Sequence, residues 1–257
     1  ESTGVTDGDP VSRWTSKDVG AYEFAQATAS KRPLYKASAI NSQPGILFDG
    51  VDDLLVCASA FLTGETGTVI IVFRLTAVPD AYQTILASSD EAADTRYVEL
   101  RARGNTANPH IMMEQRNADT ADTLDADTTV DVDTDYALVF HGSGSAITAM
   151  LNDTAQTIAA DAGANTGDWW DDATAKDNVT IGAVKRTTET RHMTGYVADV
   201  IVYSAVQGTA ELADLDDYVF SQYGLSIGSY VETEVSVVGW SQEYRQNGTD
   251  LVEHTFE

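Results

Sequence analysis

The chain has 257 residues, which suits one all-β domain and is long enough to bury a sizeable core. Its 40 acidic and 15 basic residues give a net charge of −25, which makes nucleic acid and anionic membranes poor partners. The single cysteine, Cys57, excludes an intramolecular disulfide and is expected to be a buried thiol.

The charge also suggests a setting for the protein. A dense carboxylate surface with few lysines is typical of halophilic proteins, because salt screens the self-repulsion of the acidic groups. We therefore expect a halophilic protein with an acidic surface, from a saline environment. No apolar run approaches the roughly 18 residues of a membrane span. No signal peptide is visible and the chain begins with Glu1, so we expect that preceding residues were removed or omitted.

The first strong motif along the chain covers residues 44–56. Two short apolar runs, residues 46–48 and 54–56, flank a polar segment that contains Asp49-Gly50. Branched and aromatic residues around Asp-Gly turn chemistry predict a tight β-hairpin. Asp49 and Asp52 are best interpreted as turn formers that accept hydrogen bonds from their own backbone.

Strand patterns follow in order. Residues 67–75 are apolar on both faces, which predicts a central strand that is covered on two sides. In residues 96–103, Tyr97, Glu99, Arg101 and Arg103 alternate with small or apolar side chains, so they share one face. Further strands are predicted at 83–87, 110–116, 136–141, 146–152, 178–183 and 195–203, and a solvated loop with one short strand at 117–135.

One helix is predicted at residues 209–223. Leu212, Leu215, Val219 and Tyr223 recur at three- and four-residue spacing and form a single apolar stripe. Thr209 is the expected N-cap, and Gly224 is expected to end the helix in the left-handed conformation.

Four motifs in this order resemble the LamG-like (laminin G/concanavalin A-like) jelly-roll family. They are the Gln26–Tyr35 segment, Phe48-Asp49-Gly50 with the following Asp pair, the strands at 178–183 and 195–203, and Tyr223-Gly224-Leu225. The resemblance implies an all-β fold, an antiparallel two-sheet β-sandwich (concanavalin A-like jelly roll) with one short C-terminal helix. The family usually has one more apolar strand near the start, which is not visible here and is either trimmed or supplied from elsewhere.

The domain organisation follows from these limits. Residues 1–227 are predicted to form the LamG-like jelly-roll domain. Residues 228–257 have strand alternation at Val235 and Val237 and an Asn247-Gly248 pair, which predicts a β-hairpin with a type I′ turn. This extension is either an extra strand pair or a connection to another domain or subunit.

Catalytic patterns are weak, and we expect no enzyme. A β-glucanase-type hydrolase needs two carboxylates on one strand face, and an alginate-lyase-type enzyme needs companion motifs that the sequence lacks. Glu99 and Arg101 are therefore interpreted as a solvated strand face with cross-strand pairing. The histidines have no zinc-ligand spacing.

A binding site is predicted at Trp169-Trp170, which lies between Asp168 and Asp171-Asp172. Sugars stack their C–H faces on indole rings while carboxylates hold the hydroxyl groups. The alternative is that one indole plugs the end of the sandwich and the other covers it.

Calcium is a possible cofactor. Clustered carboxylates on rim loops suit Ca²⁺, and many relatives of this fold hold calcium there. The candidate ligands are Asp90, Glu91 and Asp94 in one loop and Asp171 and Asp172 in another. The alternative is a pair of solvated loops, since acidic clusters are expected by chance in so acidic a chain.

Two functions remain open. The first is a non-catalytic carbohydrate-binding or adhesion module, extracellular or on a virion or cell surface, that binds a glycan or cell-surface polysaccharide through its rim loops. The alternative is a structural virion component, such as a capsid decoration, turret or fibre domain, that assembles as a homo-oligomer or with other virion or surface proteins. A polysaccharide lyase or glycoside hydrolase is a weaker hypothesis.

Overall fold

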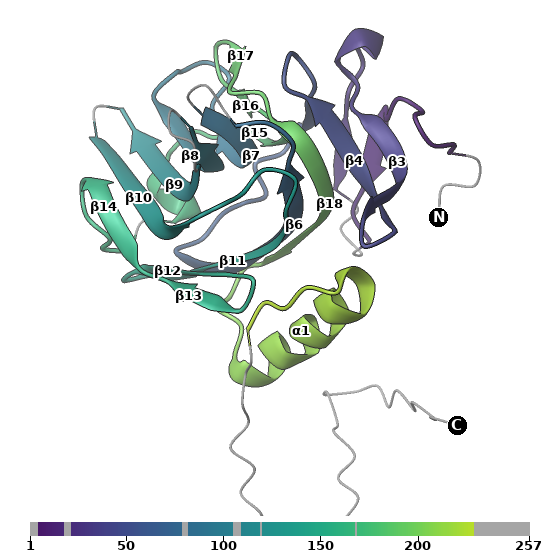
Figure 1. Ribbon diagram of the computed structural model, residues 1–257. Coiled ribbons are helices and arrows are strands. Elements are labelled where there is room, and N and C mark those ends of the chain that lie inside the picture. The colour runs from purple at the N-terminus through teal and green to yellow at the C-terminus, as the bar shows by residue number, and fades with distance from the viewer. Residues whose placement is uncertain are drawn as a thin grey trace, which may run out of the picture.

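The computed structural model describes residues 5–17, 22–78, 82–104, 109–118, 120–167 and 169–228. Two large antiparallel sheets pack face to face, and one helix lies outside the sandwich (Figure 1). The predicted fold class, an antiparallel β-sandwich with one short helix, is confirmed. The predicted C-terminal hairpin lies outside the described residues, as does the N-terminal tetrapeptide.

The larger sheet has nine strands. Their order is β1 (Arg13–Thr15), β2 (Glu23–Ala25), β5 (Leu55–Cys57), β15 (Asn178–Ile181), β7 (Tyr82–Ser89), β8 (Arg96–Arg103), β9 (His110–Asn117), β10 (Thr120–Thr129) and β14 (Ile158–Ala162).

The second sheet has seven strands. Their order is β13 (Thr154–Gln156), β12 (Ile147–Leu151), β11 (Asp135–Ser143), β6 (Thr66–Leu75), β18 (Thr194–Tyr203), β4 (Gln43–Asp49) and β3 (Leu34–Ile40). A small hairpin of β16 (Val184–Lys185) and β17 (Glu189–Thr190), the helix α1 (Thr209–Tyr223) and two 3₁₀ turns, η1 (Ala29–Lys31) and η2 (Trp170–Asp172), complete the fold.

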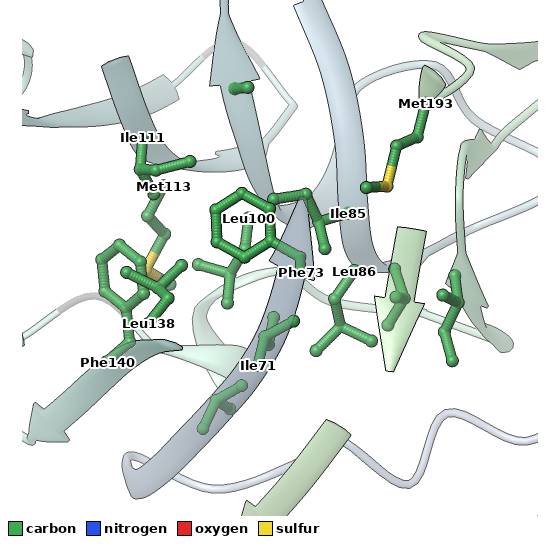
Figure 2. Close-up of a cluster of buried hydrophobic side chains, with 14 of the residues drawn as sticks. Ile71, Phe73, Ile85, Leu86, Leu100, Ile111, Met113, Leu138, Phe140 and Met193 are labelled. Carbon is green, nitrogen blue, oxygen red and sulfur yellow. The ribbon is translucent and has the colours of Figure 1, made fainter. Parts of the chain in front are cut away.

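The core fills the space between the two sheets (Figure 2). Phe73 of β6 and Phe140 of β11 come from one sheet and meet Leu100 of β8 and Met113 of β9 from the other. All four side chains are at most 1% exposed. Alternation along each strand sends every second side chain into this layer, which is why the period-2 pattern located these strands.

Strand β6 is covered on both faces, as its continuous apolar run predicts. Ile71 and Phe73 lie in the core between the sheets, while Ile70 and Val72 face the other way. Val219 and other buried residues of α1 pack with that second pair. The helix therefore closes the outer face of the seven-stranded sheet.

The helix has the predicted bounds and ending. Gly224 has φ 65° and its N–H donates to the carbonyl of Phe220, which is the expected left-handed C-cap. The N-cap is Gly208, and Thr209 is the first helical residue, so the prediction that Thr209 caps the helix is wrong. Among the described residues no helix combines the length and apolar character that crossing a bilayer requires.

Two predictions about strand arrangement are wrong. The apolar runs around Asp49-Gly50 do not form a hairpin, because β4 belongs to the seven-stranded sheet and β5 to the nine-stranded one. The turn between them carries the chain from one layer to the other. The expected solvated loop at 117–135 contains the ten-residue strand β10. Its Leu124 and Ala126 are buried, whereas Asp125 between them is half-buried and Asp127 is exposed.

Candidate functional site

The outer face of the nine-stranded sheet carries a cluster of buried charge, which we call the arginine–glutamate cluster. It consists of Glu99 and Arg101 of β8, Glu114 of β9, and Arg191 from the segment between β17 and β18. The register of the sheet assembles three of them: Glu99 is the direct cross-strand partner of Glu114, and Arg101 is two residues further along the same face.

Each carboxylate of the cluster is held by both guanidinium groups and by a hydroxyl. Arg101 and Arg191 contact Glu99, which also accepts a 2.7 Å hydrogen bond from Thr84 Oγ1. Glu114 is ion-paired with Arg101, lies 3.8 Å from Arg191 Nη1, and accepts a 2.6 Å hydrogen bond from the Tyr97 hydroxyl. Two positive and two negative groups balance, which makes their burial tolerable.

The cluster is buried on one side and accessible on the other. The side chains of Glu99 and Arg101 are 0% and 3% exposed, whereas that of Arg191 is 20% exposed. Val184 of β16 packs on Ala87 and Tyr97 of the same outer face, so the β16–β17 hairpin covers part of it. The expectation that Glu99 and Arg101 form a solvated face is wrong, although their cross-strand pairing is confirmed.

Tyrosine rings line the guanidinium groups. Arg101 Cζ lies 3.8 Å from the centroid of the Tyr82 ring, and Arg191 Cζ lies 5.2 Å from it. Arg191 also lies 5.4 Å from the Tyr97 ring. The Nε of Arg101 is buried and has no hydrogen-bond partner within the described part of the chain. The Arg191 guanidinium lies near both rings. Such contacts fix the orientation of a guanidinium and leave the donors at its edge available.

The backbone of Arg191 has a strained conformation and is held in place by β7. Its φ is 61°, in the left-handed region that branched and long side chains rarely adopt. Its carbonyl accepts a 2.8 Å hydrogen bond from the Thr84 N–H, which anchors the residue to β7. Strain of this kind persists where surrounding structure imposes it and is concentrated at functional sites.

The predicted tryptophan site is not at the surface. Trp169 is 0% and Trp170 2% exposed, and both belong to the main core cluster. Their rings lie 5.2 Å apart, and the Trp169 indole lies against Gly67 and Gly142, where any side chain would collide with it. At this degree of burial the two indoles offer almost no surface on which a sugar could stack. The alternative, that these indoles plug the end of the sandwich, agrees with the structure. Asp168 lies outside the described residues.

The predicted calcium ligands of the first loop each contact a different side chain. Asp90 contacts Arg96 Nη1 at 3.2 Å, Glu91 contacts Lys185 Nζ at 2.5 Å, and Asp94 accepts from Thr187 Oγ1 at 2.5 Å. Within the described ranges, these three carboxylates are not grouped around a common point.

The second loop gives the same result. Asp172 accepts a 2.8 Å hydrogen bond from the Trp169 N–H, and the exposed Asp171 is not grouped with it around a common point. Calcium as a cofactor stays a prediction.

A different acidic group does come together. Within the described ranges, the one set of three residues whose ligand atoms lie within 4.8 Å of one another is Asp49, Asp52 and Asp53. Asp49 Oδ1 accepts from the N–H groups of Val51 and Asp52, which confirms its predicted role as a turn former. Burial and the neighbouring Asp49 raise the pKa of Asp53 to about 6. The sequence motif contained Asp53, but its burial was not predicted.

The comparisons with known proteins bear on the fold. No family model matches the chain, and no curated protein matches it. The Ruminococcus gnavus IT-sialidase CBM40 bound to α2,3 sialyllactose is 19% identical, with 82% of this chain and 96% of that chain covered and a TM-score of 0.50. The same module bound to α2,6 sialyllactose is 18% identical, with the same coverage and TM-score.

A NanB sialidase from Streptococcus pneumoniae is also similar in structure. It is 18% identical, with 66% of this chain and 27% of that chain covered and a TM-score of 0.53, so this chain spans about a quarter of its length. The chain has a jelly-roll β-sandwich fold. At these identities the likeness establishes architecture, and the function has to be argued from the residues of the site.

Proposed function

We propose that this protein is a non-catalytic glycan-binding module that takes an acidic sugar at the arginine–glutamate cluster. The observation that carries the proposal is the partly exposed Arg191 guanidinium, fixed by a strained backbone and by the Tyr82 and Tyr97 rings. A planar guanidinium matches a carboxylate with two parallel hydrogen bonds, so the exposed edge of Arg191 suits a ligand that carries a carboxylate.

The ligand class follows from the same groups. The carboxylates of Glu99 and Glu114 are each engaged by guanidinium groups and a hydroxyl, so they are poorly placed to serve as a general acid or a nucleophile. A ligand that brings its own carboxylate, such as a sialic or uronic acid, would share the Arg191 donors with Glu99. The CBM40 structures that contain sialyllactose have the same architecture, which supports this class of ligand.

We also propose that the protein is a member of the LamG-like family and is displayed on a virion or cell surface in a saline environment. The net charge of −25 supports the saline setting, because it would repel an acidic glycan at low ionic strength. The alternative function, a structural virion component that assembles with copies of itself, is favoured by one observation: within the described residues, about half of β18 has no strand beside it on one side.

The binding proposal is tested on immobilised acidic and neutral glycans at molar salt. Wild-type protein should bind glycans that carry a carboxylate, and Arg191→Gln should lose that binding. Arg13→Gln is the matched control, since it removes one positive charge from the exposed strand β1, where Arg13 pairs with Glu23. Binding to neutral glycans alone would contradict the proposed ligand class, and equal binding by both variants would contradict the proposed site.

A further inference from the structure

Strand β18 is paired unequally on its two sides. It pairs with β6 from Gly195 to Tyr203 but with β4 only from Thr194 to Val197. Beyond Val197, β4 diverges and no described strand replaces it. The N–H of Val200 turns back to its neighbour's carboxylate, Asp199 Oδ1, at 2.9 Å. By the alternation of an antiparallel ladder, the N–H of Val202 points to the same open side.

A groove runs beside this open edge. It has a volume of about 800 Å³ and lies between β18 on one side and strands β1 and β2 of the other sheet on the far side. Its walls are mainly apolar and aromatic, and they include Trp14, Phe24, Phe61, Leu86, Val200 and Val202.

The groove leaves core-facing side chains of a central strand incompletely covered. Val200 and Val202 pack against the main core but are only half-buried, whereas Val69 and Ile71, their partners on β6, are at most 1% exposed. A strand edge next to a half-filled apolar groove is the arrangement that a further extended segment completes, with backbone hydrogen bonds to the edge and alternate side chains in the groove.

We infer that residues 233–238 of this same chain occupy the groove as an added strand beside β18. This segment lies outside the described residues and reads Thr-Glu-Val-Ser-Val-Val. Its alternation sends Val235 and Val237 to one side, where they would fill the space beside Val200 and Val202. Glu234 and Ser236 would face away from the core. This inference is independent of the glycan site, which lies on the outer face of the nine-stranded sheet.

The length of the chain and the place where its described part ends support this occupant. Ile227 N–H donates to Asp216 Oδ1 at 2.6 Å, so the chain leaves the fold beside the middle of α1. Leu215, the residue just before Asp216 in that helix, lines the groove. A helix with its side chains is about 10–12 Å across, which an extended chain crosses in about four residues. Residues 229–232 therefore suffice to bring residue 233 to the groove.

Hydrogen exchange on the full chain tests the inference. If the segment is docked, the amides of residues 198–203 should be protected like those of β6, because the open edge and the surrounding groove are covered. The double variant Val235→Asp/Val237→Asp should expose this edge and accelerate exchange in residues 198–203 by about tenfold or more, while β11 stays unchanged. The matched control Glu232→Gln/Glu234→Gln alters the same segment on its other face and should leave exchange unaltered.

Two results would overturn the inference. One is fast exchange at residues 198–203 in the wild-type chain, or protection that the valine variant does not reduce. The other is protection that depends on concentration, together with a dimer in light scattering that the valine variant dissociates. That second result would assign the added strand to a second copy and favour the assembly function.

Discussion

Asp53 offers a prediction whose size follows from the structure. Its side chain is buried, at 5% exposure, beside Asp49, and this raises its pKa from 3.8 to about 6. A carboxyl group whose pKa is higher in the folded state favours folding when it is protonated. Its contribution is therefore fully present below about pH 4 and is lost as the pH rises through about 6.

The magnitude is two pKa units at about 1.4 kcal/mol each, or about 3 kcal/mol as an upper figure. Asp53→Asn keeps an oxygen that can accept the 3.0 Å hydrogen bond from the Asp49 N–H but removes the charge. We expect this variant to be more stable than the wild type at pH 7, by up to about 3 kcal/mol, and nearly equal to it at pH 4.

The assay is urea unfolding at constant molar salt, with a chelator, at half-unit steps between pH 4 and 7. Asp52→Asn is the control, because it removes a neighbouring charge from a more exposed side chain of the same turn. If Asp53→Asn and wild type differ by the same free energy at every pH, the buried carboxyl is not the cause. A repeat with Ca²⁺ in place of the chelator tests whether this turn, which is not one of the loops predicted to hold calcium, binds a cation. A cation bound at Asp49, Asp52 and Asp53 would stabilise wild type above pH 6 and leave Asp53→Asn unaffected.

Two further predictions concern stability. Trp169→Ala should destabilise the fold by about 3–5 kcal/mol, because it empties a fully buried site against Gly67 and Gly142, whereas Phe220→Ala, at a side chain 64% exposed on α1, should cost little. Urea unfolding of both variants checks this, and equal stabilities would mean that the indole is not packed as described. The melting temperature should rise from low to molar KCl, because salt screens the repulsion within a chain of net charge −25; a melting temperature that does not change with KCl would rule out halophilic adaptation.

Much of the architecture could be predicted from local patterns. Some patterns depend only on neighbours within one element, so they can be recognised directly in the sequence. They are the apolar run of β6, the alternation of β8, and the apolar stripe and terminal glycine of α1. The separation of β4 and β5 into different sheets could not be predicted in the same way, because periodicity does not say in which sheet a strand lies. Strand β10 was not predicted at its full length, because its buried residues Leu124 and Ala126 stand in a segment rich in aspartate.

The site was harder to predict than the fold. Glu99 and Arg101 are adjacent on one strand face, but Glu114 comes from the next strand and Arg191 from a turn about 90 residues later. Only the register and the hairpin over the sheet bring them together and bury them. The Trp169-Trp170 pair has a composition typical of a sugar-binding platform. Trp169 is buried against Gly67 and Gly142, which are far from it in the sequence, so no local pattern signals this burial.

The central claim is that Arg191 receives an acidic glycan, and one titration tests it most directly. Binding of sialyllactose and of a uronic-acid oligosaccharide is measured by calorimetry at molar salt for wild type, Arg191→Gln and Arg13→Gln. A charged hydrogen bond contributes about 1.5–3 kcal/mol, so Arg191→Gln should weaken binding of at least one of these ligands by about tenfold or more. Arg13→Gln should match wild type. Absence of binding to both ligands by wild-type protein, or equal affinities for all three proteins, would contradict the account.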